Sequence, residues 1–316
     1  MGTVPESSKP LVHIPVLPEE IAGFLPVEAG DTVVDATVGS GGHARMLAQR
    51  LGPKGRLIGL DVDPGNLSIA RAALAGCTCR IDLVHENYRR IRAVLAAQNV
   101  EHVDVVLADL GVSSTQLDDP ERGLSFQQDG PLDMRLDPRL EVTASDLVNR
   151  LSERELADLI YFNAQEMKSR RIARHICRQR RDRRITTTGR LAEITCRALG
   201  VRDPSSRRSR IHPATRTFQA LRMAVNDEPG ALAAFLQAAP NVLKPGGRIA
   251  IIAFHSVEDK PVKLNFRKRK SEGTYELLTK KPVIASPEER ERNPRSRSAK
   301  LRVARRLETR PALETG

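Results

Sequence analysis

"VVDATVGSGGHARML", residues 33–47, passes from an apolar, β-branched run through closely spaced glycines into helix-forming residues. Comparable apolar runs follow at residues 56–63, 80–87 and 103–110, and the segments between them have the composition of helices. A fifth run of this kind, residues 246–256, comes much later in the chain. Because strands that alternate with helices indicate a parallel sheet with helices on both faces, the sequence predicts an α/β fold.

The glycine turn after the first strand fits two classes of cofactor. Its glycines align with the dinucleotide pattern G-x-G-x-x-G/A, which places a pyrophosphate at a helix N-terminus. Asp35, Gly39 and Gly41 also fit the acidic-x-G-x-G-x-G loop of S-adenosylmethionine-dependent methyltransferases, with Thr37 in the place of the first glycine. The acidic Asp61, about twenty residues further on, suits a ribose diol in either class. The turn by itself leaves both cofactors open.

The composition points to a polyanionic partner. There are 51 Lys and Arg against 39 Asp and Glu, which gives a net charge of +12 and a pI near 10.0. Such an excess favours nucleic acid over a small metabolite. The 4 cysteines have no zinc-ligand or disulfide spacing, and no apolar run approaches a membrane span. We therefore expect a cytoplasmic protein with neither a metal site nor a membrane association.

The long interval before the fifth strand has a different character. From residue 118 to residue 216, strand-like alternation is almost absent, and helical spacing with Ser or Thr at the helix starts prevails. We expect residues 118–216 to form an inserted helical subdomain that recognises RNA. Residues 1–117 and 217–316 then form the cofactor-binding domain around it.

One predicted helix of this insertion, "RRIARHICRQRRDRR" at residues 170–184, is strongly basic. Arg170, Arg174 and Arg178 recur at four-residue steps and therefore share one helical face. Like charges at this spacing repel one another unless an anion lies across them, so we predict that these arginines bind RNA phosphates. A solvated charged face is the alternative. For two further basic runs, residues 267–270 and 290–306, a flexible and solvated segment is the simplest interpretation.

The end of the fourth strand separates the two cofactor classes. A nicotinamide enzyme needs a partner for hydride transfer, whereas a methyl acceptor needs hydrogen-bond acceptors around its nucleophilic atom. "DLGVSS", residues 109–114, offers acceptors, and we predict that Asp109 holds a hydrogen of an amino nucleophile. Ser113, Ser114 and His255 are further catalytic candidates. The residues do not identify a general base.

Four long motifs then make the chain recognisable. They are "DLGVSSTQLDDPERGLSFQQDGPLDMRLD" (109–137), "HPATRTFQALRMAVN" (212–226), "FHSVED" (254–259) and "NPRSRSAKLRVA" (293–304). In this order behind "DATVGSGGH" (35–43), they closely resemble the bacterial 16S ribosomal RNA cytosine-N4 methyltransferase family, known as RsmH or MraW. The resemblance spans roughly residues 13–305.

The resemblance implies a class I (Rossmann-like) S-adenosylmethionine-dependent methyltransferase sheet with an inserted helical subdomain. It also implies methylation of the N4 amino group of cytidine 1402, in ribosomal numbering, in the decoding region of 16S rRNA, within the small ribosomal subunit. The positions that match the cofactor contacts of the family are Gly41, Gly42, His43, Asp61, Asp109 and Gln116, with Tyr88 beside the adenosine. Asp35 joins them from the general methyltransferase loop.

Two other functions remain open on the residues alone. A DNA amino-methyltransferase would share the glycine loop and the acid after the fourth strand, but its proline-aromatic motif is not found here. A non-enzymatic ribosome assembly factor would need only the basic helices and not Gly41, Gly42, Asp61 and Asp109. The oligomeric state is also left open.

Overall fold

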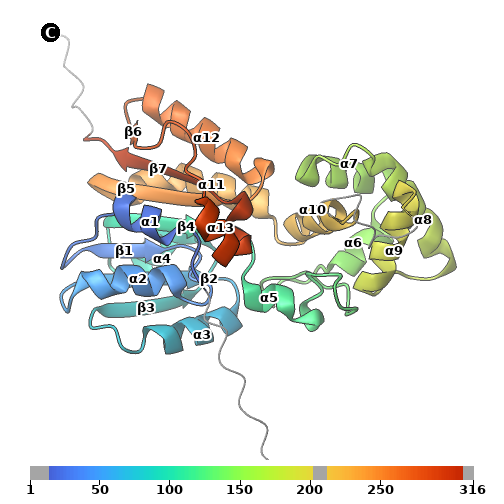
Figure 1. Cartoon of the computed structure of the whole chain (residues 1–316), viewed down its shortest axis with the longest axis horizontal. Helices are drawn as coiled ribbons and strands as arrows, with labels where there is room; N and C mark the ends of the chain where they lie inside the picture. Colours follow the sequence, from blue (N-terminus) through green and yellow to red (C-terminus); the bar gives the residue numbers. More distant parts are fainter. Residues whose placement is uncertain (1–13, 202–211, 309–316) are drawn as a thin grey trace, which may run out of the picture.

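The computed structural model describes residues 14–201 and 212–308, and it is built around one seven-stranded sheet (Figure 1). The strand order is β3-β2-β1-β4-β5-β7-β6. The strands are β1 (Thr32–Asp35), β2 (Arg56–Asp61), β3 (Arg80–His85), β4 (Val103–Asp109), β5 (Leu243–Ala253), β6 (Tyr275–Leu277) and β7 (Lys300–Arg306). Strands β1 to β5 pair in parallel, and β7 is antiparallel to both of its neighbours. The predicted α/β fold is confirmed.

Helices cover both faces of the sheet, which explains the nearly continuous apolar runs of the central strands. Neighbouring side chains of a strand point to opposite faces, so Val33 and Val34 of β1 pack into different cores. On the Val33 side lie α1 (Pro18–Phe24), α2 (Gly42–Leu51) and α3 (Pro64–Leu74). On the Val34 side lie α4 (Ile91–Ala97), α11 (Glu228–Val242) and α12 (Ser256–Ser271).

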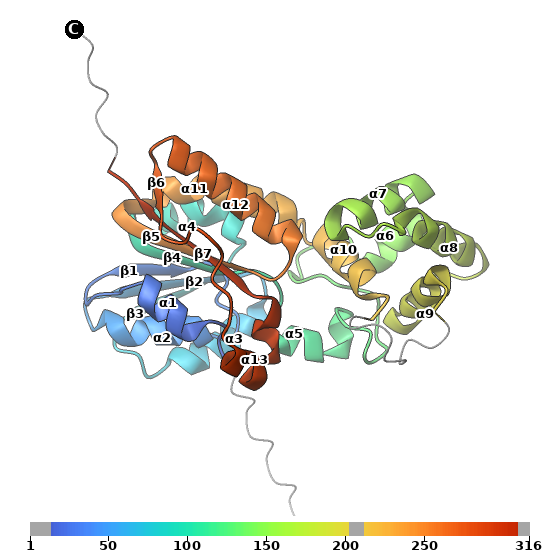
Figure 2. The same ribbon diagram turned by 45° about the horizontal axis from the view of Figure 1, so that its top comes forward.

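A separate group of helices lies beside the sheet (Figures 1 and 2). Its members are α6 (Ala144–Arg150), α7 (Glu153–Ala164), α8 (Ser169–Asp182), α9 (Thr188–Leu199) and α10 (Thr215–Val225), and α5 (Ser114–Asp118) leads toward them. Thr143, Ser152 and Thr187 cap the starts of α6, α7 and α9, as the Ser and Thr positions predict. These helices share one apolar core.

The expected division of the chain remains a prediction, and its second boundary falls within a helix. Residue 216 lies in α10, and Phe218 and Leu221 of the same helix belong to the core of the helical group. The apolar core of the helical group therefore extends to the end of α10. Across the described ranges, no helix combines the length and the apolar character that a membrane span requires.

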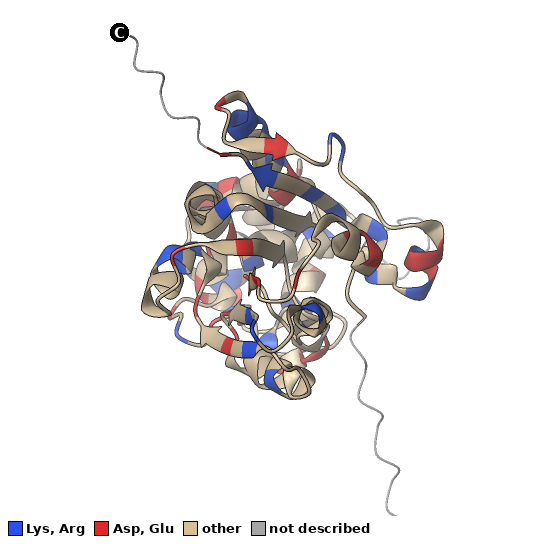
Figure 3. Cartoon of the chain, turned by 90° about the vertical axis from the view of Figure 1, so that its left-hand side faces the viewer, with Lys and Arg blue, Asp and Glu red and all other residues tan. Residues whose placement is uncertain are grey.

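The interpretation of the two late basic runs as flexible segments is wrong. Residues 267–270 form the last turns of α12, and residues 290–306 contribute to α13 (Pro287–Arg292), the short 3-10 helix η3 (Pro294–Ser298) and β7. Strand β7 enters the sheet between β5 and β6, where Leu301 and Val303 are fully buried. Figure 3 shows its Lys and Arg residues in blue. Apolar residues between the basic ones supply the buried contacts that hold β7 in the sheet.

Two further short 3-10 helices lie in the connections between the larger elements. They are η1 (Tyr88–Arg90) after β3 and η2 (Pro120–Arg122) after α5.

Candidate active site

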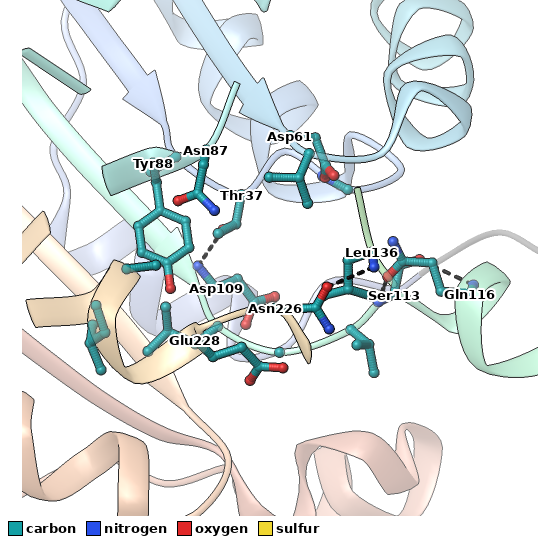
Figure 4. A pocket seen from close by; sticks show the side chains of 18 of the residues that line it. Thr37, Asp61, Asn87, Tyr88, Asp109, Ser113, Gln116, Leu136, Asn226 and Glu228 are labelled. Atoms are coloured by element: carbon teal, nitrogen blue, oxygen red, sulfur yellow. Dashed lines mark hydrogen bonds between the residues drawn. The ribbon is translucent and has the colours of Figure 1, made fainter. Parts of the chain in front are cut away.

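A cavity of about 540 Å³ opens at the carboxyl ends of the parallel strands (Figure 4). Residues at or just after the end of each of these strands line it: 36–40 for β1, 61–62 for β2, 86–89 for β3, 109–113 for β4, and 254–255 with 257–258 for β5. The strand order reverses between β1 and β4, and open α/β sheets bind their ligands at such a point. The volume is that of a typical cofactor or substrate pocket.

The glycine turn brings the start of α2 to the cavity. Gly39 and Gly41 have positive φ angles of 50° and 87°, which favour glycine. A Cβ atom on Gly41 would lie 3.2 Å from the Cα atom of Ala70, so Gly41 permits close packing of the turn against α3. Gly42 lines the cavity, whereas Gly41 lies behind its wall. Gly41 therefore shapes the turn, and its predicted contact with the cofactor stays a prediction.

Asp35 also lies behind the cavity wall. Its side chain is buried, and Oδ1 accepts a hydrogen bond from the Thr37 amide at 3.1 Å. Burial raises the pKa of Asp35 to about 7. In the structure Asp35 holds the turn, and its predicted contact with the cofactor stays a prediction.

Asp61, at the end of β2, faces the cavity and also organises the turn. Its Oδ2 accepts hydrogen bonds from the Gly39 amide at 2.9 Å and from Asn66 Nδ2 at 3.2 Å, and its Oδ1 accepts one from the Asp63 amide at 2.8 Å. Burial raises its pKa to about 6. A carboxylate offers about four lone-pair sites, so one acceptor position remains for a ligand hydroxyl.

Asp109 lies at the end of β4, at the centre of the cavity wall (Figure 4). Its amide donates to Thr37 Oγ1 at 2.6 Å, which ties β4 to the glycine turn. Its carboxylate Oδ1 is buried and has no hydrogen-bond partner among the described residues. Burial, with a smaller contribution from the carboxylate of Glu258, raises the pKa of Asp109 to about 7.

His255 and Glu258 bring the start of α12 to the same cavity. Glu258 Oε2 accepts a hydrogen bond from the Phe254 amide at 2.9 Å, and its Oε1 lies 3.2 Å from His255 Nε2. Burial works to raise the pKa of Glu258, but the contact with His255 and other favourable interactions outweigh it and lower the pKa. His255 therefore neighbours an ionised carboxylate at the edge of the site.

The remaining predicted residues occupy the walls of the cavity. Tyr88 packs edge-on against Phe235, and burial raises the pKa of Tyr88 far above its usual range, so the phenol stays neutral. Gln116 accepts from the Ser113 amide at 2.9 Å and donates to Asp63 Oδ2 at 2.8 Å, so protein partners occupy its amide. Ser113 is the N-cap of α5, and the side chain of Ser114 lies outside the described residues.

The cavity fits the S-adenosylmethionine that the motifs imply. Asp61 and the unpartnered Oδ1 of Asp109 supply acceptors for hydroxyl or amino groups. Their carboxylates also suit the positive charge of a sulfonium. Apolar side chains such as Tyr88 and Leu232 supply the walls that an adenine ring needs.

The junction of α10 and α11 contributes residues to which the sequence assigned no role. Arg222 and Glu228 form a two-point ion pair at 2.8 and 2.9 Å beside the cavity. Asn226 accepts from the Leu136 amide at 2.7 Å and donates to the Met134 carbonyl at 2.8 Å, which ties this junction to the insertion (Figure 4). The only signal in the sequence was the motif at residues 212–226, which contains both Arg222 and Asn226.

The predicted arginine face lies on α8, away from the cavity. Arg170, Arg174 and Arg178 are exposed, while Ile172 and Ile176 of the same helix are buried. Arg174 lies 3.5 Å from Glu153, a surface contact of little energetic weight. The shared face is confirmed, and its binding to RNA stays a prediction.

Known proteins are similar in sequence to almost the whole of this chain. A protein of Koribacter versatilis named Ribosomal RNA small subunit methyltransferase H is 48% identical over 301 residues, which cover 93% of this chain and 94% of that protein. A protein of Sorangium cellulosum with the same name is 49% identical over 296 residues, covering 93% and 91%. The sequence profile of the MraW methylase family matches residues 10–307, which include every strand and every cavity residue described above. The chain therefore belongs to the MraW methylase family.

Proposed function

We propose that this protein transfers the methyl group of S-adenosylmethionine to the N4 amino group of a cytidine in the RNA of the small ribosomal subunit, at position 1402 of 16S rRNA in ribosomal numbering. One observation carries the proposal: the carboxylate of Asp109 lines the cavity next to the glycine turn, and its Oδ1 has no hydrogen-bond partner among the described residues. The names of the two relatives support ribosomal RNA as the substrate. With such a substrate we expect the enzyme to act in the cytoplasm.

Asp109 has a specific task in this reaction. The sulfonium of the cofactor supplies an activated methyl group, so the protein mainly has to hold the nucleophile in line with it. The N4 lone pair of cytosine is delocalised into the ring. An acceptor on one N4 hydrogen favours the pyramidal nitrogen that attacks, and Asp109 Oδ1 provides it.

The residues around Asp109 support that task. Thr37 holds the backbone of Asp109 at the cavity, because its hydroxyl accepts a hydrogen bond from the Asp109 amide. Ser113 and His255 line the same cavity. The target base has to leave its stack, because N4 lies on the Watson–Crick edge and a paired base cannot reach an enclosed methyl group.

The test is incubation of the purified protein with labelled S-adenosylmethionine and small ribosomal subunits that lack the modification, followed by mapping of the labelled nucleotide. We expect label on N4 of one cytidine. An Asp109→Ala variant that still binds the cofactor serves as the control and should leave the subunits unlabelled. Label on another base or on DNA offered in parallel, or binding of the subunits without cofactor binding, would overturn the proposal.

A further inference from the structure

Helix α12 begins at the cavity and leads away from it across the methyltransferase sheet. His255, Glu258 and Pro261, at its first turns, line the cavity, and Val262 and Phe266 bury its inner side. In Figures 1 and 2 the helix starts on the side that faces α7 and α10 and ends beside β6. Ser256 Oγ donates to Gln165 Oε1 at 3.1 Å, so the start of α12 touches the end of α7.

The outer side of α12 carries a row of cations, which we call the α12 basic face: Lys260, Lys263, Arg267 and Lys270. They follow one another at steps of three or four residues and therefore share a face of the helix. Within the described ranges, none of the four has a carboxylate oxygen within 4.0 Å.

The acidic residues near α12 are committed to other partners. Glu258 is buried beside His255, and Asp259 pairs with Arg302 at 2.6 Å. Glu272 lies 3.8 Å from Lys268 and 3.2 Å from Arg269, two cations outside the α12 basic face. The positive charge of the α12 basic face is therefore not neutralised by any carboxylate of the described residues.

The stability of the helix does not explain this row. Cations in the last turn of a helix are favoured by the helix dipole, which accounts for Lys270. Lys260 and Lys263 lie before the last turn, where the dipole does not stabilise them, and like charges at these spacings destabilise a helix. Leu264, which is 54% exposed, lies in the same row and offers an apolar contact to a sugar or base.

We propose that the α12 basic face binds the sugar–phosphate backbone of the RNA segment next to the target nucleotide. The RNA would then lie across the mouth of the cavity, held by α12 of the methyltransferase domain and by the arginine face of α8 on the insertion. In this arrangement the methyltransferase domain itself contacts, through the α12 basic face, the RNA strand that enters the cavity. This inference rests on the proposed RNA substrate.

The experiment compares three proteins of full length. The test variant is Lys260→Gln/Arg267→Gln/Lys270→Gln, and the control variant is Lys54→Gln/Arg71→Gln/Arg92→Gln, which removes the same charge at exposed positions outside the cavity and outside α12. Binding to small subunits that lack the modification is measured from low to moderate salt. The test variant should flatten the slope of log affinity against log salt by about two units, at about 0.7 to 0.9 per contact.

The control variant should keep the slope of the wild type, and all three proteins should bind S-adenosylmethionine equally and melt at similar temperatures. Equal slopes for the test and control variants would overturn the α12 inference. Binding to anionic lipid vesicles is measured in parallel. The inference would also be overturned if the test variant lost binding to these vesicles while its RNA binding stayed unchanged. Methylation by the wild type tests the proposed function separately, because a flattened slope without methylation would keep the α12 basic face as an RNA surface and reject the proposed reaction.

Discussion

Nδ1 of His43 lies 3.6 Å from the carboxylate Oδ2 of Asp109. The other ring nitrogen, Nε2, contacts the carbonyl oxygen of Val16 at 2.8 Å, and a carbonyl can only accept a hydrogen bond. Burial lowers the pKa of His43, so the ring is neutral. No imidazolium therefore offsets the burial of Asp109, which explains why the pKa of that carboxyl is raised.

The rate of methyl transfer should rise with pH through about 7. Asp109 accepts a hydrogen of the nucleophile best as a carboxylate, and its pKa is raised to about 7. Asp109→Asn should lower the single-turnover rate more than it lowers cofactor affinity, and it should remove this pH dependence. Asp104→Asn, at the opposite end of β4, is the control and should keep the profile. Equal losses of rate and cofactor affinity would reassign Asp109 to cofactor binding.

Asp109→Asn should also stabilise the fold, and more so at pH 8 than at pH 5. The folded pKa of about 7 lies above the ordinary value of 3.8, so the folded state holds a proton that the unfolded state releases. The stabilisation that comes from this proton is complete below the unfolded pKa and is lost as the pH rises through about 7. Asn is neutral at both pH values. Thermal unfolding of both proteins checks this, and a shift independent of pH would contradict it.

Asp61→Ala should weaken S-adenosylmethionine binding by about 1.5 to 3 kcal/mol, the usual effect of losing a hydrogen bond to a charged group. The same change frees the amides of Gly39 and Asp63, so Asp61→Asn, which keeps an acceptor, should show a smaller loss. RNA affinity should stay the same in both variants. Calorimetry is the measurement, and an unchanged cofactor affinity in Asp61→Ala would remove this residue from the cofactor site.

Gly41→Ala should destabilise the protein by about 1 to 3 kcal/mol, the usual cost of a strained backbone conformation. The φ angle of 87° disfavours any side chain, and the new Cβ would meet the backbone of Ala70 at 3.2 Å. Gly76→Ala is the matched control, because Gly76 has open space around it and no positive φ angle. Denaturant unfolding should separate the two variants. Equal stabilities would show that the turn tolerates a side chain.

Arg170→Gln/Arg174→Gln/Arg178→Gln should flatten the salt dependence of RNA binding by roughly two units, at about 0.7 to 0.9 per phosphate contact. Cofactor affinity should not change, because α8 contributes no residue to the cavity. If the face is merely solvated, the slope stays the same and the helix becomes more stable once the like charges are gone. Titration of small subunits from low to moderate salt distinguishes the two outcomes.

The sequence by itself determined the features that depend on near neighbours in the chain. Alternating apolar runs and helices predicted the parallel sheet, and a parallel sheet brings the carboxyl ends of its strands to one edge. That rule predicts that Asp61 and Asp109 lie at the same edge of the sheet. Helical periodicity likewise predicted that Arg170, Arg174 and Arg178 share an exposed face. Each of these inferences needed only local spacing or a known rule of topology.

Only the tertiary structure decided which distant residues meet and how burial changes their chemistry. The apolar residues of β7 left its pairing partner unspecified, and packing placed it antiparallel between β5 and β6. The charges of Arg222 and Glu228 pair beside the cavity because α10 turns there into α11. Asp109 owes its raised pKa to burial and to Glu258, which is far away in sequence. Desolvation and long-range contacts exist only in the packed chain. The spacing of residues along the sequence therefore does not predict them.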